Sequence, residues 1–486
     1  MILDRRCLFL QLKGRVSPLV TNARQVVDEF DLVVVGGGNG GYTAAIRATQ
    51  LGLTAALIER DKVGGTCLHR GCIPTKAWLE SSGFLERVRR ASALGVRVDN
   101  ISLDYPAVVA RQKQVVETLY KGLRSTILKH KVKIIEGDGQ LVSPTQVAVN
   151  GRTLTAKNVI IATGSQPKDI PGMEVDGERI LNSDHLLQLE RIPKSILIVG
   201  AGAVGCEFAS FYTDVGAEVT LIEMMPTIVP LEDPAVGQTL AKSLAARGVN
   251  VMTSARVLPE KTRSYDGMVE LTVEHENQSK TVKAEVVLSA VGREAIVDNL
   301  GLEKTAVKVK RGWVEVDDAY RTDGASVYAV GDAIGGLLLA HVASAEGFLA
   351  AEAIAGRDIE KLDYNRVPRV TYSHPQVASV GMTEQQAKEA GLNAKSQRYS
   401  FRNNAMALIE DEPEGFAKVV YDADSGDFLG AHIIGNHAGE LISEAALARF
   451  IEASAWEVGS SIHPHPTLSE ALGEAARLSA GISIYW

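Results

Sequence analysis

The hydrophobic pattern in the first part of the chain predicts a strand, a turn, a helix and a second strand. A short apolar run at 31–35 is followed at once by a glycine-rich turn. An alanine-rich stretch at 42–51 then precedes another apolar run at 54–58, which ends at Glu59. Uninterrupted apolar runs of this length are typical of strands that are buried on both faces of a parallel sheet. We therefore predict a βαβ unit here.

The same order of positions returns in the middle of the chain. An apolar run at 196–199 precedes a glycine-rich turn, a helical stretch that ends near 215, and a second apolar run at 218–222 that ends at Glu223. The acid stands at the same distance from the first glycine of the turn in both copies. This repetition predicts a second βαβ unit of the same construction.

Both turns match the pattern G-x-G-x-x-G. The glycines are Gly36, Gly38 and Gly41 in the first copy, and Gly200, Gly202 and Gly205 in the second. Glycines at this spacing let the backbone approach a pyrophosphate at a helix N-terminus, and the terminal acid binds a ribose hydroxyl. An ordinary tight turn explains one copy alone but hardly both. The sequence therefore predicts two dinucleotide sites in a doubly wound α/β fold.

The acid of the second copy also indicates which nucleotide binds there. A carboxylate at the position of a 2′-phosphate repels NADP, whereas NADP sites usually place an arginine there. No Lys or Arg follows Glu223 until well past Pro226. If the second site holds the nicotinamide, we expect NAD.

The last part of the chain, from about Lys361, has a different pattern. Strand-like segments such as 417–421 and 431–434 alternate with polar stretches. We predict a third, α+β domain, in agreement with the number of domains expected for a chain of 486 residues.

Composition narrows the classes of function. Hydrophobic residues make up 45% and charged residues 23% of the chain, as in ordinary globular proteins. The net charge of −8 argues against nucleic acid as a partner, and no apolar run approaches the length needed to span a membrane. Four cysteines indicate a reducing compartment, so we predict a cytoplasmic protein.

Residues 1–28 differ from the rest in charge. Only Asp4 offsets their five basic residues before Asp28, which are Arg5, Arg6, Lys13, Arg15 and Arg24. This bias resembles an organelle transit segment, but the stretch has few hydroxyl side chains. We predict an N-terminal extension of a cytoplasmic protein, with a transit segment and a mitochondrial matrix location as the alternative.

Two of the four cysteines, Cys67 and Cys72, stand five positions apart downstream of the first glycine turn. A regular helix would hold their Cα atoms roughly 8 to 9 Å apart, beyond the ~4.4 to 6.8 Å of a disulfide. We therefore predict a distorted turn, for which Gly71 supplies the conformational freedom, and a redox-active disulfide. The alternatives are two buried cysteines without chemistry, or zinc, for which a second ligand pair is missing. We predict no metal site.

These motifs together resemble the flavin-dependent pyridine nucleotide–disulfide oxidoreductases, and within that family the members that oxidise dihydrolipoamide. The resemblance runs from about Phe30 to the C-terminus. The segments that carry it are Gly64-Gly65-Thr66-Cys67, Gly71-Cys72-Ile73-Pro74-Thr75-Lys76, Ala162-Thr163-Gly164-Ser165, Tyr328-Ala329-Val330-Gly331-Asp332-Ala333 and His463-Pro464-His465-Pro466-Thr467-Leu468-Ser469-Glu470.

The resemblance implies a domain order. After the extension at 1–28, an FAD-binding domain would comprise 29–160 and 290–357. An NAD-binding domain would be inserted at 161–289, and an interface domain for dimerisation would follow at 358–486. Both nucleotide domains would be Rossmann-like.

The resemblance also implies roles for individual residues. Cys67 would exchange with the substrate and Cys72 would lie against the flavin. Lys76, paired with Glu207, would sit near the reactive edge of the flavin. His465 would be the acid–base group, oriented by Glu470, and His463 a supporting neighbour. From the sequence alone, Glu470 also fits the N3 position of a capping box with Thr467 as N-cap.

The cofactor contacts implied by the resemblance form two sets. For FAD they are Gly36, Gly38, Gly41, Glu59, Lys76, Thr163, Gly164, Ser165, Gly331, Asp332, Ala340 and His341. For NAD they are Gly200, Gly202, Val204, Gly205, Glu223, Gly292 and Arg293. The segment 339–341 would begin a helix that points at the isoalloxazine.

The implied reaction is the oxidation of protein-bound dihydrolipoamide to lipoamide, with reduction of NAD+ to NADH, in a homodimer in which His465 reaches the disulfide of the other subunit. The dithiol would come from the lipoyl-bearing acyltransferase of a 2-oxoacid dehydrogenase complex or from a glycine cleavage lipoyl protein. Another NAD(P)H-dependent disulfide reductase of this family, or a redox-sensing flavoprotein without turnover, remain alternatives. Two departures from the family pattern are His69-Arg70 within the cysteine loop and Gln376, where an acid is usual. The basic pair either lowers a thiol pKa or faces solvent.

Overall fold

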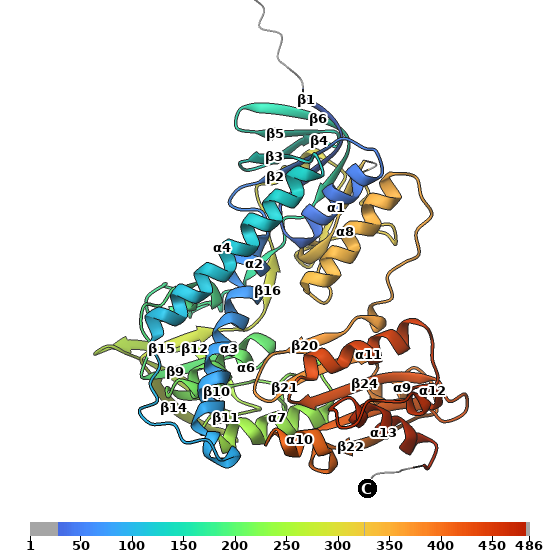
Figure 1. The fold of residues 1–486 in the computed structure, drawn as a ribbon. Helices are drawn as coiled ribbons and strands as arrows, with labels where there is room; N and C mark the ends of the chain where they lie inside the picture. Colours follow the sequence, from blue (N-terminus) through green and yellow to red (C-terminus); the bar gives the residue numbers. More distant parts are fainter. Residues whose placement is uncertain (1–27, 325, 483–486) are drawn as a thin grey trace, which may run out of the picture.

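The computed structural model describes residues 28–324 and 326–482. The predicted N-terminal extension lies outside the described residues, apart from Asp28, at which the first strand begins. The chain forms a mixed α/β fold with three main sheets, arranged as one upper and two lower units in Figure 1. This confirms the predicted fold class.

The first sheet contains the first predicted βαβ unit. Its strands run in the order β3-β2-β1-β6-β5-β4, and β19 joins β6 beside β5. The strands are β1 (Asp28–Val35), β2 (Ala55–Glu59), β3 (Lys133–Glu136), β4 (Gln140–Ser143), β5 (Gln146–Val149), β6 (Arg152–Ile161) and β19 (Val327–Ala329). Strands β1, β2, β3, β6 and β19 are parallel, and β4 and β5 form an antiparallel extension.

Helices α1 (Asn39–Gln50) and α8 (Ala340–Ile354) pack side by side against this sheet (Figure 1). The two backbones approach closely, because a Cβ added at Gly347 would lie 2.2 Å from the carbonyl oxygen of Gly40. Helix α1 begins earlier than the predicted start at 42, since the last glycines of the turn already belong to the helix. The predicted helix start at 339–341 is confirmed by α8, whose N-cap is Leu339.

The second sheet repeats the plan, with the order β11-β10-β9-β15-β8 and parallel pairing between neighbouring strands. Its elements are β8 (Ile180–Leu181), β9 (Ser195–Val199), α6 (Ala203–Asp214), β10 (Glu218–Ile222), α7 (Pro234–Ala246), β11 (Asn250–Met252) and β15 (Val286–Ser289). A three-stranded antiparallel sheet of β12 (Arg256–Tyr265), β13 (Met268–His275) and β14 (Gln278–Ala284) packs beside it. The second predicted βαβ unit is thus confirmed.

Helix α3 (Cys72–Arg89) connects the two nucleotide-type units. It runs downward in Figure 1 beside α4 (Tyr105–Lys129) and packs against α6. The fully buried indole of Trp78 stacks on Phe211 at a centroid distance of 4.8 Å. Because Cys72 is the first residue of α3, this packing fixes the second cysteine relative to both units.

The third sheet is antiparallel, with the order β20-β21-β24-β23-β22. Its strands are β20 (Arg369–Thr371), β21 (Gln376–Gly381), β22 (Ala394–Ser400), β23 (Phe416–Asp422) and β24 (Phe428–Gly435). Helices α11 (Ala438–Phe450), α12 (Ala455–Ser460) and α13 (Glu470–Ser479) cover it. The strands predicted at 417–421 and 431–434 are confirmed.

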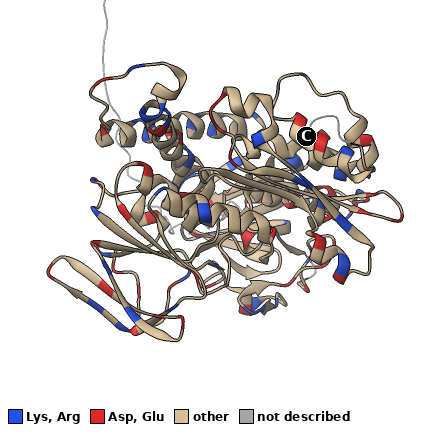
Figure 2. Cartoon of the chain, turned by 90° about the horizontal axis from the view of Figure 1, so that it is seen from below, with Lys and Arg blue, Asp and Glu red and all other residues tan. Residues whose placement is uncertain are grey.

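Lys and Arg positions are interspersed with Asp and Glu positions along the helices and loops in the view of Figure 2. Among the described residues, no helix combines the length and the apolar character that a membrane crossing requires.

Candidate functional site

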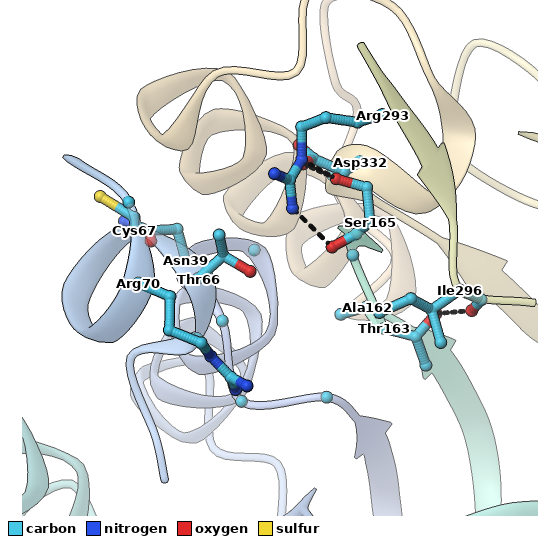
Figure 3. Close-up of a pocket in the computed structure, with 18 of the residues that line it drawn as sticks. Asn39, Thr66, Cys67, Arg70, Ala162, Thr163, Ser165, Arg293, Ile296 and Asp332 are labelled. Carbon is cyan, nitrogen blue, oxygen red and sulfur yellow. Dashed lines mark hydrogen bonds and ion pairs between the residues drawn. The ribbon is translucent and has the colours of Figure 1, made fainter. Parts of the chain in front are cut away.

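A cavity of about 650 Å³ opens between the first sheet, the cysteine segment and α6. Cys67 and Arg70 lie on one side of it, and Ser165, Arg293 and Asp332 lie on the other (Figure 3). Most residues predicted to contact FAD line this cavity. These are Gly36, Gly38, Glu59, Lys76, Thr163, Gly164, Ser165, Gly331, Asp332 and Ala340.

The two cysteines face this cavity from consecutive helices. Cys67 belongs to α2 (Gly65–Arg70), and Cys72 begins α3. Gly71 separates the helices with φ −140° and ψ −108°, so the predicted interruption of a regular helix is confirmed. Both thiols are free in the structure, which corresponds to the reduced form of the predicted pair.

The cysteine segment is bonded directly to the first glycine turn. The backbone N–H of Gly64 donates to the carbonyl oxygen of Gly37 at 2.8 Å. A Cβ at Gly65 would lie 2.8 Å from the Cα atom of Gly38, so the two segments touch at glycines. A group bound at the turn is therefore held beside the thiols.

The two thiols differ in acidity. The Cys67 thiol is hydrogen-bonded to the Cys72 sulfur, which lowers the pKa of Cys72, and the nearby ammonium of Lys76 lowers it further. The same hydrogen bond, together with burial, raises the pKa of Cys67. Cys72 is thus the more acidic thiol of the pair. The roles of Cys67 in substrate exchange and of Cys72 against the flavin stay predictions.

Lys76 is held by a carboxylate on α6. Its ammonium donates to both oxygens of Glu207, at 2.8 and 2.7 Å, and Glu207 is 4% exposed. The backbone N–H of Tyr372 donates to the same carboxylate at 2.9 Å, and the Tyr372 ring lies 5.0 Å from the Lys76 ammonium. Glu207 raises the pKa of Lys76 against the effect of burial, so the lysine stays charged beside Cys72.

The first glycine turn is closed by its own acid. The Glu59 carboxylate accepts from the backbone N–H of Gly37 at 2.7 Å and from that of Asp61 at 2.9 Å. Gly36 has φ +107°, and a Cβ there would lie 2.2 Å from the carbonyl oxygen of Ala162. Gly41 does not line the cavity, because it is the glycine that lets α1 pack on the turn, where a Cβ would lie 1.9 Å from the Gly36 oxygen.

The second glycine turn has the same geometry. The carboxylate of Glu223 accepts from the backbone N–H of Ala201 at 2.7 Å and from that of Met225 at 2.8 Å. Gly200 has φ +100°, and a Cβ there would lie 2.4 Å from the carbonyl oxygen of Ala290. Space surrounds Gly202, where a Cβ would meet no atom within 4 Å. This turn therefore leaves room for a pyrophosphate at the start of α6.

Two residues predicted for NAD, Val204 and Arg293, line the first cavity instead. Arg293 donates from Nε to the Ser165 hydroxyl at 2.7 Å and from its terminal nitrogen to the Ser165 carbonyl at 2.8 Å. The Ser165 hydroxyl in turn donates to Asp332 at 2.5 Å. Val204 lies at the N-terminus of α6, at the border of both sites. Their assignment to NAD, like that of neighbouring Gly292, stays a prediction.

His465 and Glu470 lie in the third unit. Nδ1 of His465 is 2.9 Å from the Glu470 carboxylate, whose other oxygen accepts from the backbone N–H of Thr467 at 2.8 Å. The predicted capping box is only half present, because Glu470 accepts from the Thr467 N–H but α13 begins at Glu470 with Ser469 as N-cap. The Thr467 hydroxyl donates to the Pro464 carbonyl and makes no cap. Among the described residues that line the cavity, none comes from beyond Ala340, so His465 does not face the cysteines of its own chain.

Several lining residues escaped the sequence analysis. The segment 137–140, with Asp138 between two glycines, follows β3 at the carboxyl edge of the sheet. A glycine-flanked acid directly after an apolar strand was the available signal. Conversely, His341 does not line the cavity, and its Nε2 lies 2.9 Å from the carbonyl oxygen of Pro368.

The two departures from the family pattern have structural partners. Arg70 pairs with Asp61 at 3.0 Å at the rim of the cavity, and His69 lies 3.0 Å from the Val63 carbonyl. The lowered pKa of Cys72 comes from Cys67 and Lys76 and not from this basic pair. Arg70 nevertheless lines the cavity, so the alternative that both side chains simply face solvent does not describe it. Gln376 accepts from the backbone N–H of Gly439 at the start of α11 at 3.1 Å.

Known proteins agree with this arrangement. Residues 30–347 match the family model described as pyridine nucleotide-disulphide oxidoreductase, and residues 367–476 match the dimerisation domain of the same family. The chain is 43% identical over 471 residues to a protein of Bacillus subtilis named dihydrolipoyl dehydrogenase, with 94% of this chain and 99% of the relative covered. A protein of Zymomonas mobilis with the same name is 40% identical, with 95% and 100% covered.

Among solved structures, LpdA from Mycobacterium tuberculosis superposes with a TM-score of 0.85 at 29% identity, covering 93% of this chain and 99% of that one. The glycine turns, the acids that close them and the paired thiols fit the two dinucleotides, FAD and NAD, on which this family depends. The chain belongs to the pyridine nucleotide-disulphide oxidoreductase family, whose dimerisation domain forms its C-terminal part.

Proposed function

We propose that the protein oxidises dihydrolipoamide to lipoamide and reduces NAD+ to NADH. The observation that carries this proposal is the pair of thiols with opposite pKa shifts, which stands beside a charged lysine in the cavity that begins at the first glycine turn. The names of the Bacillus and Zymomonas relatives support the same reaction.

The chain's residues divide the reaction between them. His465 takes a proton from one thiol of the substrate, and the resulting thiolate attacks the sulfur of Cys67 in the Cys67–Cys72 disulfide. Cys72 leaves as a thiolate, which Lys76 stabilises. The second substrate thiol then attacks the mixed disulfide, lipoamide leaves, and Cys67 is protonated.

FAD, when bound at the first glycine turn, supplies the route by which the electron pair passes from Cys72 to NAD+. Glu59 and Glu223 hold the two glycine turns in the shape that admits a dinucleotide. Glu207 holds the positively charged ammonium of Lys76 in place at the border of the two sites. On this basis we propose as FAD contacts those predicted residues that line the cavity, which excludes His341 and Gly41, and we keep the predicted NAD contacts as proposals.

The working unit is a homodimer, as the match to the dimerisation domain indicates. We propose that each cavity receives His465 from the partner subunit. In support, this histidine is 60% exposed and lies on the third unit, away from the cavity that holds Cys67. Dissociation of the dimer should therefore abolish oxidation of dihydrolipoamide.

We further propose a lipoyl-bearing acyltransferase of a 2-oxoacid dehydrogenase complex, or a glycine cleavage lipoyl protein, as the source of the dithiol, and a cytoplasmic location. The low cysteine content supports a reducing compartment. The domain limits proposed from the sequence place the FAD-binding domain at 29–160 and 290–357, the NAD-binding domain at 161–289 and the interface domain at 358–486.

The decisive experiment compares two reactions in one variant. His465→Gln should lower the rate of NAD+ reduction by dihydrolipoamide about 10²- to 10⁴-fold, because the substrate thiol loses its base. Reduction of ferricyanide by NADH, which needs no substrate thiol, should stay at the wild-type rate. His275→Gln, at the end of the β13 strand, is the matched control and should change neither rate. Wild-type turnover in His465→Gln would contradict the proposal.

A further inference from the structure

The loop before α13 holds a second histidine–glutamate pair that the proposed reaction does not use. Nε2 of His463 lies 2.7 Å from the carboxylate of Glu444 on α11. Its Nδ1 lies 3.1 Å from the backbone carbonyl oxygen of Ser461. The His463 side chain is 8% exposed, whereas that of His465, two positions later, is 60% exposed.

The contacts of His463 determine its charge. A carbonyl oxygen and an ionised carboxylate only accept hydrogen bonds, so each ring nitrogen must donate. An imidazole that donates from both nitrogens is an imidazolium cation. In agreement, the hydrogen bond to Glu444 raises the pKa of His463, against the opposing effects of burial and of Arg477 on α13.

His463 also touches α13 at a position without a side chain. A Cβ added at Gly473 would lie 2.6 Å from Cε1 of the His463 ring. The ring is thus enclosed between Glu444 of α11 and the backbone of α13. Because α13 begins at Glu470, the same contact fixes the carboxylate that is bonded to His465.

We infer that His463 is a positioning residue, an imidazolium clamp that fixes the start of α13 against α11 and so orients Glu470 and His465. This inference rests on the proposed function and adds a residue to it. His465 needs one ring nitrogen directed at the substrate, and errors of about 1 Å in such placements cost up to ~10²-fold in rate. By holding the loop before α13 against α11, His463 supplies this placement.

Four variants of the full FAD-loaded dimer test the clamp. His463→Gln keeps a donor for Glu444, His463→Phe keeps the ring without its bonds, and Glu444→Gln removes the charge of the acceptor. The fourth combines His463→Gln with Glu444→Gln. Glu457→Gln, in the capping box of α12, is the control. The readouts are kcat for dihydrolipoamide oxidation, KM for NAD+, and ferricyanide reduction by NADH, which shows that each variant is folded and loaded.

We expect kcat to fall about tenfold in His463→Gln and in Glu444→Gln, and no further in the double variant, because residues that act through one contact are not additive. His463→Phe should be impaired at least as much as His463→Gln. KM for NAD+ and ferricyanide reduction should not change.

The pH profile distinguishes a clamp from simple packing. Below its raised pKa, His463 carries a proton on both ring nitrogens and donates both hydrogen bonds. As the pH rises through that pKa, the ring loses one proton and with it one of the two bonds. Wild-type kcat should therefore decline on the alkaline side, and His463→Gln should lack this decline. A fully active His463→Gln, or a His463→Phe that works as well as wild type, would overturn the inference while the proposed function stands. A wild-type protein that does not oxidise dihydrolipoamide would overturn both.

Discussion

Lys76 and Glu207 join the helix that begins at Cys72 to the helix that begins at the second glycine turn. The Lys76 ammonium donates to both carboxylate oxygens, and the carboxylate also accepts from the backbone of Tyr372 in the third unit. One ion pair thus connects the thiols, the second nucleotide turn and the C-terminal sheet. The positive charge of Lys76 lowers the pKa of Cys72, and the negative charge of Glu207 raises it.

These two opposite effects on the pKa of Cys72 can be measured separately in two variants. Lys76→Met should raise the pKa of Cys72, because the nearby positive charge that lowers it is lost. In the two-electron-reduced protein, the long-wavelength absorbance of a thiolate beside oxidised flavin should then reach half of its maximum at a higher pH. Glu207→Gln should move this midpoint the other way, since the Glu207 carboxylate raises the pKa of Cys72. Equal midpoints in all three proteins would contradict the electrostatic role of the pair.

Glu59 and Glu223 occupy equivalent positions, so their substitutions form a matched experiment. Each carboxylate accepts from two backbone N–H groups of its own turn. Glu59→Gln should lower the amount of FAD bound per chain and leave KM for NAD+ unchanged. Glu223→Gln should do the reverse and should also narrow the preference for NAD+ over NADP+, because the repulsion of a 2′-phosphate is lost. Absorbance spectra and the ratio of the two KM values check this. A change of FAD content in Glu223→Gln would contradict the assignment.

Alanine substitutions at two glycines of the second turn should affect the stability of the fold and the binding of NAD+ separately. Gly200→Ala adds a methyl group 2.4 Å from the Ala290 carbonyl at φ +100°, so it should destabilise the fold by roughly 1–3 kcal/mol and lower Tm. Gly202→Ala meets no atom within 4 Å and should keep the wild-type Tm. Its methyl group would instead occupy the space through which the pyrophosphate approaches, so KM for NAD+ should rise about tenfold or more. Thermal unfolding and steady-state kinetics with NAD+ test the pair.

Much of the fold could be predicted from local patterns in the sequence. Apolar runs, glycine spacing and a terminal acid specify a βαβ unit through contacts near in sequence, which is why both units agree with prediction. The bonds of Glu59 and Glu223 to backbone N–H groups of their turns were not predicted, and their contacts with a ribose stay a prediction. The interruption at Gly71 follows equally from geometry that spans a few residues.

Contacts between residues that lie far apart in the sequence were harder to predict. Arg293 stands next to residues of the second unit in sequence, yet its side chain bonds to Ser165 in the first cavity, across 128 positions. The helix start at Glu470 was misjudged because Ser469 is the N-cap, and the Thr467 hydroxyl bonds to the Pro464 carbonyl of the preceding loop instead of accepting from the helix. The contact of Tyr372 with Glu207 depends on the docking of the third unit, for which no short-range pattern exists.

His432, in the middle of the third sheet, should make the stability of the protein depend on pH. Its side chain is fully buried, and Nε2 donates to the Met382 carbonyl at 3.1 Å. In the sheet it lies between Ser379 and Lys418, and Lys418 pairs with Asp233 of the second unit. Burial lowers the pKa of His432, although the carboxylates of Asp233 and Glu232 act against this effect.

The direction of the dependence follows from proton binding. Because the pKa of His432 is lower in the folded than in the unfolded protein, the unfolded chain takes up the proton first as the pH falls below about 6.5. Tm should therefore drop between about pH 7.5 and about pH 5.5, and His432→Gln, which keeps a donor for Met382, should show a smaller drop. His130→Gln, at the end of α4, is the control and should follow the wild-type curve. If His432→Gln and wild type lose the same Tm over this range, the buried histidine does not contribute to acid sensitivity, and the carboxylates of the ion pairs would have to account for it.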